Sequence, residues 1–464
     1  MTSAGLTAAR EKMQAAGVDE VAIRTFAHYY GLLEAGETGM IPESTIDPVD
    51  MESLADVEVA DEAASAALRT TAVIKLNGGL GTSMGMDRAK SLLCVRRGLS
   101  FLDVIARQIL HLRQEHGAPL PLILMNSFRT SADTMDALAR YEDLPVAGLP
   151  LEFLQNKEPK LLVDGLTPAE WPADPTLEWC PPGHGDIYTA LRGTGLLDRL
   201  LEAGYERVFI SNSDNLGATP DPRVAGWFAA SGAPFAIEAV RRTPSDRKGG
   251  HFARRKSDDR LVLRETAQTL DEDKAALADL ERHRFCSTNN IWVDLAALKA
   301  VLDERDGVLG LPMIRNEKTV DPADKTSPKV IQVESAMGAA IEVFEGATLI
   351  EVGRDRFVPV KTTNDLLVLR SDVYSLGQDF VLDQVSESLP FIDLDDDYYK
   401  LVDGFDRRFP EGAPSLKQAT SLRVDGDVTF GKGVEVVGDV KVQGEAGKRI
   451  EPGTVLKEDA APHA

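Results

Sequence analysis

Short apolar runs alternate with helical stretches through the middle of the chain. Four of these runs read TAVIKL, PLILMN, RVFIS and PFAIEAV, at residues 71–76, 121–126, 207–211 and 234–240. Apolar runs of this length are typical of buried strands, and their alternation with helical segments indicates βαβ units. We therefore predict an α/β fold with a central mixed, mostly parallel sheet and helices on both of its faces.

Different patterns flank this region. Residues 1–70 are polar with loosely helical spacing of apolar positions, which predicts a helical N-terminal region. Within it, residues 41–62 carry eight carboxylates and no Lys or Arg, so we expect a solvated acidic connection there. The sheet domain would occupy residues 71–375, and residues 376–464 would form an acidic connection followed by a separate C-terminal domain.

The C-terminal part contains short Val-rich pieces separated by glycines. Residues 424–456 read VDGDVTFGKGVEVVGDVKVQGEAGKRIEPGTVL. This pattern predicts a few coils of a left-handed β-helix-like domain. Because the repeat is irregular, a small meandering sheet with glycine turns is the alternative.

Composition excludes several classes of protein. The 464 residues include 74 acidic and 51 basic ones, and the resulting net charge of −23 repels nucleic acids and anionic membranes. Three widely spaced cysteines cannot form a disulfide framework. The first residues lack the pattern of a signal peptide, and no run of 18 apolar residues occurs. We expect a cytoplasmic protein with no nucleic-acid or membrane partner.

A glycine-rich loop directly follows the first predicted strand. Residues 76–85 read LNGGLGTSMG, and Lys90 closes the loop. Glycines let the backbone approach a ligand and turn its N–H groups toward an anion. The loop is neither a P-loop, because Ala89 precedes the lysine, nor a dinucleotide fingerprint, because Met84 stands where Gly or Ala is needed. A tight structural turn is the alternative, although four glycines in eight positions make it less favoured.

Asp214 is a candidate metal ligand. It follows the predicted strand 207–211, within SNSDNLG, where a carboxylate would face the crevice at the carboxyl edge of the sheet. A helix or turn cap in this Asx-rich loop is the alternative.

The glycine loop and several later segments resemble the eukaryotic-type UTP–glucose-1-phosphate uridylyltransferases, or UDP-glucose pyrophosphorylases. The segments that carry the resemblance are Lys90-Ser91-Leu92, Met125-Asn126-Ser127, PPGHGD at 181–186, SNSDNLGAT at 211–219, Lys248-Gly249-Gly250, TNNIW at 288–292 and RFVPVKTT at 356–363. They occur in family order over roughly residues 70–370, which is far more specific than one glycine loop. The resemblance implies a Rossmann-like nucleotidyltransferase sheet.

The resemblance also implies a reaction. A glucose 1-phosphate oxygen would attack the α-phosphorus of UTP, giving UDP-glucose and pyrophosphate. A phosphate monoester has a second pKa of about 6 and needs no general base at neutral pH. The rate would then depend on positioning and on neutralising charge, with Mg²⁺ as the implied cofactor.

The resemblance assigns roles to individual residues. Lys90 and Lys361 would be catalytic, and Asp214 would bind Mg²⁺. Residues expected to contact the nucleotide are Leu76, Asn77, Gly78, Gly79, Lys90, Met125, Gln155, Gly183 and Lys361. Residues expected to contact the sugar phosphate are His184, Asn212, Ser213, Asp214, Glu238, Gly250 and Asn289.

Some of these assignments have structural alternatives. For Glu238, Asn289 and Glu334, a hydrogen-bonded structural role is about as well supported as recognition of sugar hydroxyls. Gly250 would either approach the sugar closely or form a hairpin turn. His184, between two glycines, is interpreted as a ligand contact and not as a base.

The chain departs from the family pattern in two places. After Gln155 it reads NKEPK where the family typically has SRYPR, so Lys157 and Lys160 keep the charge but lose the arginine fork. Between Gly85 and Lys90 it reads Met-Asp-Arg-Ala and lacks the usual Gly-Pro.

Other functions compete with the glucose enzyme. An N-acetylhexosamine uridylyltransferase typically has Gly-Thr-Arg where this chain has Gly81-Thr82-Ser83, so Ser83 favours glucose. A broad-specificity UDP-sugar pyrophosphorylase is a further alternative. A non-catalytic UDP-sugar-binding assembly protein is the third. The expected partners are UTP, glucose 1-phosphate and, through the C-terminal domain, other copies of the chain.

Overall fold

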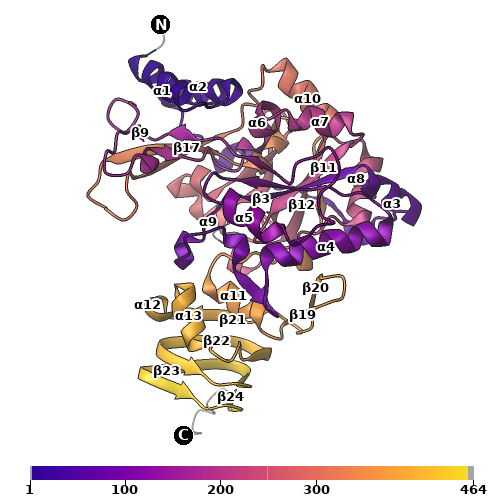
Figure 1. Cartoon of the computed structure of the whole chain (residues 1–464), viewed down its shortest axis with the longest axis vertical. Coiled ribbons are helices and arrows are strands. Elements are labelled where there is room, and N and C mark those ends of the chain that lie inside the picture. Colours follow the sequence, from indigo (N-terminus) through magenta and orange to yellow (C-terminus); the bar gives the residue numbers. More distant parts are fainter. Residues whose placement is uncertain (1–2, 248, 458–464) are drawn as a thin grey trace.

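An eight-stranded sheet forms the centre of the computed structural model, which describes residues 3–247 and 249–457 (Figure 1). In spatial order its strands are β2 (Glu52–Ser53), β18 (Thr348–Glu351), β12 (Phe235–Arg241), β15 (Phe285–Asp294), β11 (Arg207–Asn212), β3 (Thr71–Asn77), β6 (Leu122–Asn126) and β7 (Glu152–Leu154). Within the described residues, β15 pairs antiparallel with β11 and β12, and the other neighbouring strands pair parallel. The prediction of a mixed α/β fold with a mostly parallel sheet is confirmed.

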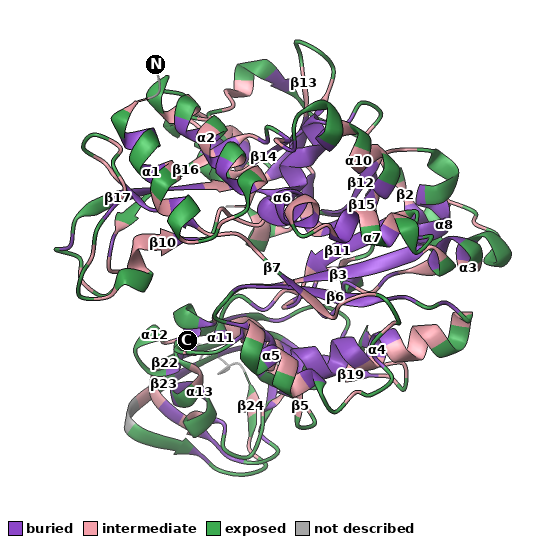
Figure 2. Ribbon diagram, turned by 45° about the horizontal axis from the view of Figure 1, so that its top comes forward, coloured by how far each residue is buried: buried purple, intermediate pink, exposed green. Residues whose placement is uncertain are grey.

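The four predicted strands correspond to β3, β6, β11 and β12, each within a residue or two of its expected ends. They are buried on both faces, as Figure 2 shows for the strands at the centre of the molecule. Alternate residues of one strand enter different cores: Val73 packs in one core, whereas Ala72 and Ile74 pack in the other.

Helices cover both faces of the sheet. The core around Val73 includes residues of α3 (Asp61–Arg69), α4 (Phe101–His116) and α8 (Pro222–Ser231). The core around Ile74 includes residues of α6 (Asp186–Gly193), α7 (Leu196–Glu202) and α10 (Leu295–Glu304). Helix α4 begins with a capping box, in which Ser100 N donates to Asp103 Oδ2 at 2.9 Å and Asp103 N donates to Ser100 Oγ at 3.2 Å.

The N-terminal region forms two helices and then joins the sheets. Helices α1 (Ala4–Ala15) and α2 (Glu20–Glu34) lie at the N-terminal end of the long axis (Figure 1). The expectation that residues 41–62 are a solvated connection is wrong in part. Ile46, in β1 (Ile46–Asp47), is fully buried and pairs with β13 (His251–Arg255), while β2 extends the central sheet. Isolated apolar residues between the carboxylates provide these buried contacts.

Smaller elements connect these parts. The short helices are α5 (Ser131–Leu138), α9 (Lys274–Leu277), α11 (Thr363–Arg370), α12 (Asp396–Tyr399) and α13 (Val402–Arg408). The remaining strands outside the C-terminal sheet are β4 (Cys94–Arg96), β5 (Leu99–Ser100), β8 (Glu158–Pro159), β9 (Leu161–Leu162), β10 (Trp179–Cys180), β14 (Leu261–Arg264), β16 (Met313–Thr319), β17 (Lys329–Ser335), β19 (Tyr374–Leu376) and β20 (Leu382–Gln384).

A separate four-stranded sheet lies at the C-terminal end of the molecule (Figure 1). Its strands β21 (Phe391–Leu394), β22 (Ser415–Phe430), β23 (Glu435–Ile450) and β24 (Val455–Lys457) pair parallel with their neighbours. The meander alternative therefore does not describe this part, because a meander pairs antiparallel. The connections 431–434 and 451–454 are far shorter than a usual crossover between parallel strands.

The described residues contain no helix that combines the length and the apolar character needed to cross a membrane.

Candidate active site

The predicted nucleotide-binding residues gather at one edge of the sheet. Strands β3, β6, β7 and β11 are parallel, so their carboxyl ends meet there. Ser213 N, just after β11, donates to Leu76 O at 3.1 Å, and Gln155 N, just after β7, donates to Asn126 O at 2.8 Å. The side chain of Asn77 is buried and donates to Asn126 Oδ1 at 2.7 Å. Leu76, Asn77, Met125, Gln155, Asn212 and Ser213 thus come from neighbouring strand ends.

Two glycines of the loop have different surroundings. A Cβ on Gly78 would lie 2.6 Å from Gln155 Oε1, so the amide of Gln155 lies directly against this backbone. A Cβ on Gly79 would meet no atom of the described residues within 4 Å. Gly78 therefore permits the approach of Gln155, whereas Gly79 faces open space in which a ligand can come close.

Three motifs that are distant in sequence meet at Lys90. Its Nζ lies 2.7 Å from Asp214 Oδ2 and also donates to Val360 O. Val360 N in turn donates to Asp214 O at 3.1 Å, and Lys90 N donates to Gly79 O at 3.2 Å. The sequence proposed Lys90 and Asp214 as site residues but did not pair them, because no local signal predicts a contact across 124 residues. The ion pair partly neutralises the proposed metal ligand.

Lys361 follows Val360 and is exposed. Its backbone N–H donates to Asp365 Oδ2 at 2.8 Å, within the cap that starts α11. Across residues 3–247 and 249–457, its Nζ has no hydrogen bond or ion pair. The backbone is therefore anchored beside Asp214 while the ammonium remains available to a ligand.

The PPGHG loop is held against β17. Gly183 has a φ of +80°, and a Cβ there would lie 2.6 Å from Ser335 O. Ser335 N donates to Pro182 O at 3.0 Å, and Gly185 N donates to Ser335 O at 2.8 Å. These bonds fix the loop that carries His184.

His184 is a neutral imidazole in this setting. Its Nδ1 accepts a hydrogen bond from Met337 N at 3.0 Å, and burial lowers the pKa of His184 to about 4. The ring therefore offers an Nε2–H donor at neutral pH, which suits a ligand contact better than proton abstraction. The contact with Met337 had no signal in the sequence.

Asn289 lies in a bulge of β15. The pairing with β12 shifts register between Glu238 and Ala239, and Asn289 has a φ of +58°. Bulges and left-handed residues of this kind re-aim side chains beside functional sites.

Gly250 precedes β13 and lies against Glu265, where a Cβ would be 2.6 Å from Glu265 Oε2. It is therefore not in the hairpin turn between β13 and β14, while Lys248 of the same motif lies outside the described residues.

Glu238 is fully buried in a polar network below this edge. Its carboxylate accepts from Arg356 Nε at 2.6 Å and from Arg356 Nη2 at 2.7 Å. Asn290 Nδ2 and Trp292 Nε1 each donate to it at 2.9 Å. With four donors on two oxygens, Glu238 holds neighbouring residues in place and has no exposed surface for a ligand.

The same network connects the strand ends to the segment that carries Lys361. Asn215, one residue after Asp214, donates to Arg356 O at 3.1 Å and accepts from Val358 N at 2.8 Å. Arg356 and Asn215 were quoted only as parts of motifs, and their positioning roles were missed. Glu334 is half-buried on β17, with Lys318 Nζ 3.5 Å from its carboxylate.

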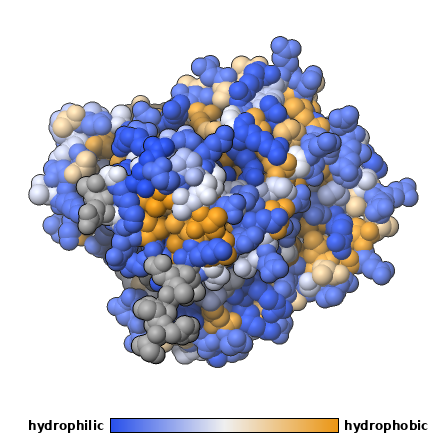
Figure 3. Space-filling model, turned by 90° about the horizontal axis from the view of Figure 1, so that it is seen from below, coloured by the Kyte–Doolittle hydropathy of each residue, from blue (hydrophilic) through white to orange (hydrophobic). Residues whose placement is uncertain are grey.

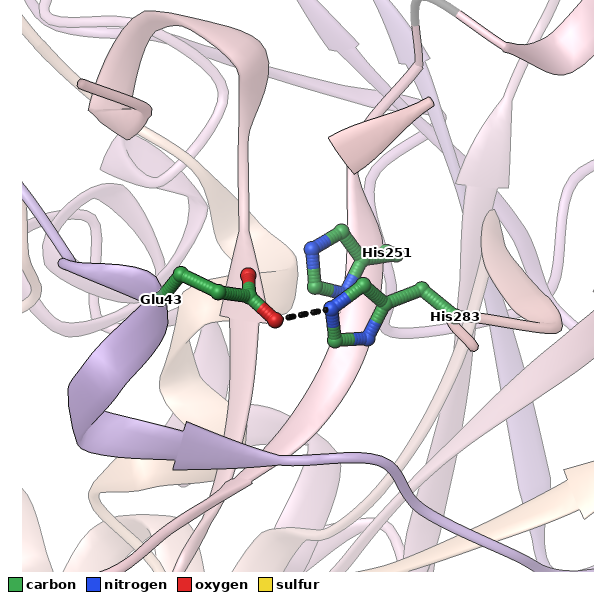
Figure 4. Close-up of side chains that lie close together, drawn as sticks. All are labelled: Glu43, His251 and His283. Carbon is green, nitrogen blue, oxygen red and sulfur yellow. Dashed lines mark hydrogen bonds and ion pairs between the residues drawn. The ribbon is translucent and has the colours of Figure 1, made fainter. Parts of the chain in front are cut away.

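A second cluster, Glu43 with His251 and His283, also brings metal-ligand types together (Figure 4). The two rings are stacked, with centroids 3.6 Å apart and planes 20° apart, so an ion could not lie in the planes of both. Glu43 already accepts from Arg264 and Arg282, each at 2.6 Å. These cations oppose a metal ion, and we interpret the cluster as a junction that holds the Glu43 segment against β13 and β14.

Fold and site together define a nucleotide-binding enzyme of the nucleotidyltransferase class: a mostly parallel sheet, a glycine loop at its carboxyl edge, and a lysine–aspartate pair beside a lysine whose ammonium has no partner among the described residues. Comparison with known proteins agrees, because residues 23–437 match the model of the family described as UTP–glucose-1-phosphate uridylyltransferase. The chain belongs to the UTP–glucose-1-phosphate uridylyltransferase family.

Individual relatives cover nearly the whole chain. The UTP–glucose-1-phosphate uridylyltransferase of Hordeum vulgare is 38% identical over 85% of this chain and 82% of its own length. The solved UDP-glucose phosphorylase of Trypanosoma brucei is 46% identical, with a TM-score of 0.90 and coverage of 98% of both chains. A variant of the Leishmania major UDP-glucose pyrophosphorylase in complex with UDP-glucose is 44% identical, with a TM-score of 0.92 and coverage of 99% of both chains.

Proposed function

We propose that this chain transfers the uridylyl group of UTP to glucose 1-phosphate, giving UDP-glucose and pyrophosphate. The observation that carries the proposal is the meeting of Lys90, Asp214 and the segment before Lys361 at the sheet edge. A reaction between two polyanions needs aimed positive charge more than it needs a base. A protein that only bound a UDP-sugar would not need all three groups, which argues against the assembly-protein alternative.

In this mechanism the sugar phosphate is already ionised when it binds, so no side chain has to remove a proton. Its oxygen attacks the α-phosphorus in line with the departing pyrophosphate. Lys361, whose backbone is anchored by Asp365, reaches the phosphates with its free ammonium. Lys90 exchanges its contact with Asp214 for a phosphate oxygen. Both ammonium groups lower the repulsion between substrates and stabilise charge in the transition state.

We propose Asp214 as the ligand of a magnesium ion. Enzymes of this nucleotidyltransferase family generally use a divalent metal. Mg²⁺ in nucleotide sites is usually held by one or two carboxylates together with substrate phosphates, and a half-buried aspartate with one exchangeable lysine partner fits that donor set. The bound metal would neutralise phosphate charge. The chain contributes by holding Asp214 at the end of β11.

The remaining contacts follow from position. Gln155, whose amide can donate and accept, would recognise the uracil edge beside Gly78. The full proposed nucleotide set is Leu76, Asn77, Gly78, Gly79, Lys90, Met125, Gln155, Gly183 and Lys361. The proposed sugar-phosphate set is His184, Asn212, Ser213, Asp214, Gly250 and Asn289. Glu238 contributes indirectly, because its carboxylate holds Arg356 and Asn290 in place.

We further propose three parts: a mainly helical region at 1–70, whose β2 and α3 join the central sheet and its core, a catalytic domain at 71–375 and a C-terminal domain at 376–464. The parallel pairing and short connections of β22, β23 and β24 support a left-handed β-helix in the last part.

Apolar patches lie among hydrophilic atoms on the face seen from the C-terminal side (Figure 3). Exposed Phe391 and Val455 are candidates for contacts between copies of the chain.

The location of the protein stays a prediction. Cys94, Cys180 and Cys286 are free thiols, which suits a reducing compartment such as the cytoplasm.

Pyrophosphate release tests the proposed function. Purified chain with UTP, glucose 1-phosphate and Mg²⁺ should release pyrophosphate, and Lys361→Ala should lower kcat by about 10²–10³-fold, the usual cost of removing one preorganised charge-stabilising group. Replacing the exposed Lys325 by Ala is the matched control and should change little. Galactose and N-acetylglucosamine 1-phosphates in the same assay separate the alternatives in sugar choice. Absence of turnover with every hexose 1-phosphate would refute the proposal that this chain is an enzyme.

A further inference from the structure

A lysine lies buried in the sheet beneath the proposed reaction site. Lys75 is on β3, two residues before Asn77, and only 1% of its surface is exposed. Its Nζ donates to Ser211 Oγ at 2.8 Å and to Ala218 O at 2.5 Å, and lies 5.7 Å from the ring centroid of Phe209. It belongs to no set of residues proposed above.

Burying an ammonium group is costly. Burial, together with repulsion from the Arg356 guanidinium, lowers the pKa of Lys75 to about 7, while the carboxylates of Glu238 and Asp214 oppose that shift. An apolar side chain of similar length would fill the same space without the desolvation cost. The presence of a lysine here therefore requires a reason beyond packing, and its hydrogen bonds supply one.

The two acceptors of Lys75 bracket the loop that carries Asp214. Ser211 lies in β11 just before the loop, and Ala218 lies where the loop ends. One ammonium group thus ties both ends of the loop to β3, the strand that leads directly into the glycine loop. The outer part of the loop is tied separately, because Asn215 accepts from Val358 N at 2.8 Å.

We propose that Lys75 is a positioning residue for the uridylyl transfer, which fixes the Asp214 loop relative to the glycine loop by closing its base. This inference rests on the proposed function, because it assigns Asp214 to the reaction. Lys75 touches no substrate in this account. It acts through the position of Asp214 and of its partner Lys90, and both matter most in the transition state.

The test compares loop variants with a core variant of similar instability. Lys75→Met should lower kcat by about 10–100-fold and leave KM for UTP within about threefold, because charge stabilisation is lost more than ground-state binding. Ser211→Ala removes one acceptor and should lower kcat in the same direction by about 2–5-fold. Leu200→Ala, which truncates a fully buried side chain of α7, should lower the melting temperature but keep kcat within twofold.

Binding without metal provides a second readout. The Kd for UDP-glucose, measured by calorimetry in EDTA, should change less than threefold in Lys75→Met, because the nucleotide pocket itself is intact. A lowered melting temperature with unchanged kcat in both loop variants would overturn the proposal, as would a rise in KM and Kd with kcat retained. If Lys75→Met does not fold, Ser211→Ala decides alone. Failure of the proposed function is distinguishable, since wild-type chain would then release no pyrophosphate.

Discussion

At the scale of single residues, the site depends on close approaches that only particular side chains permit. Gly78 and Gln155 come from different strand ends, yet the missing Cβ of Gly78 lets the amide lie against the backbone. The neighbouring Gly79 has open space in front of it among the described residues. Adjacent glycines in one motif therefore serve different purposes, one toward the protein and one toward the ligand.

Replacing Gly78 by Ala should displace the amide of Gln155 without unfolding the protein. The new Cβ would meet the end of a flexible side chain, so Gln155 can move at small cost to stability. We expect the melting temperature to stay near that of the wild type while KM for UTP rises about tenfold, or ~1.4 kcal/mol of binding free energy. Steady-state kinetics at varied UTP concentrations measures this change.

A double variant tests the cause. In a Gln155→Ala background, Gly78→Ala should add little to KM, because the side chain that it displaces is already gone. Equal tenfold effects of Gly78→Ala in both backgrounds would show that the methyl group acts on the ligand directly.

At the scale of elements, the strands were predictable and their partners were not. Runs such as RVFIS are continuous, apolar and bounded by polar segments, so local pattern is enough to predict a strand like β11. The bulge in β15 and the antiparallel course of that strand depend on contacts with β12 and β11, which lie far away in sequence. Periodicity within a segment does not report such contacts.

In the candidate site, too, single residues were predictable from the sequence and their contacts were not. Motif order was enough to propose Lys90, Asp214 and Lys361, because each lies in a recognisable segment. The contact of Lys90 with Asp214, the bond from Met337 to His184 and the burial of Lys75 arise only when separate elements pack. The prediction for the acidic segment 41–62 was wrong for a related reason. The burial of a few apolar residues in a core fixes a segment even when most of its side chains are exposed carboxylates.

The pair of Glu238 and Arg356 ties β12 to the segment that leads to Lys361. Glu238→Gln keeps the shape but removes the two short charged contacts of the buried guanidinium and leaves it only the carboxylate of Asp221, 3.7 Å away, so we expect a loss of ~3–5 kcal/mol in the free energy of unfolding. The exposed pair of Asp425 and Lys441 is the control, and Asp425→Asn should cost less than ~1 kcal/mol. Urea unfolding measures both variants. A loss below ~1 kcal/mol for Glu238→Gln would show that the network is not needed for stability.

At the scale of the whole molecule, separate parts of the chain share their cores. The hydrophobic core around Val73 continues through Leu366 and Leu394 to Phe430 in the C-terminal sheet. The segment around Glu43 is held by the buried Ile46 and, in addition, by a polar junction of Glu43 with the stacked rings of His251 and His283 (Figure 4). Apolar burial depends little on pH, whereas the polar junction at Glu43 contains groups that titrate. Acid should therefore weaken the molecule at the Glu43 junction.

The titration of His251 determines whether acid raises or lowers the stability of this junction. Burial, with repulsion from His283, lowers the pKa of His251 to about 3, compared with about 6.5 in an unfolded chain. Between these values the unfolded state binds a proton that the folded state does not. Stability therefore falls as pH drops from about 6.5 toward 3, by up to ~1.4 kcal/mol per pH unit for this one group, and levels off below that range.

Replacing His251 by Phe should remove this share of the pH dependence while keeping an aromatic ring against His283. We expect the free energy of unfolding of the variant, measured by urea titration at pH 7, 6, 5 and 4, to fall less steeply than that of the wild type. Phe252→Leu, a change at the adjacent buried and non-titrating position, should lower stability at every pH and keep the wild-type slope. Parallel curves for wild type and His251→Phe would place the acid sensitivity elsewhere, because a group that titrates equally in both states contributes no slope.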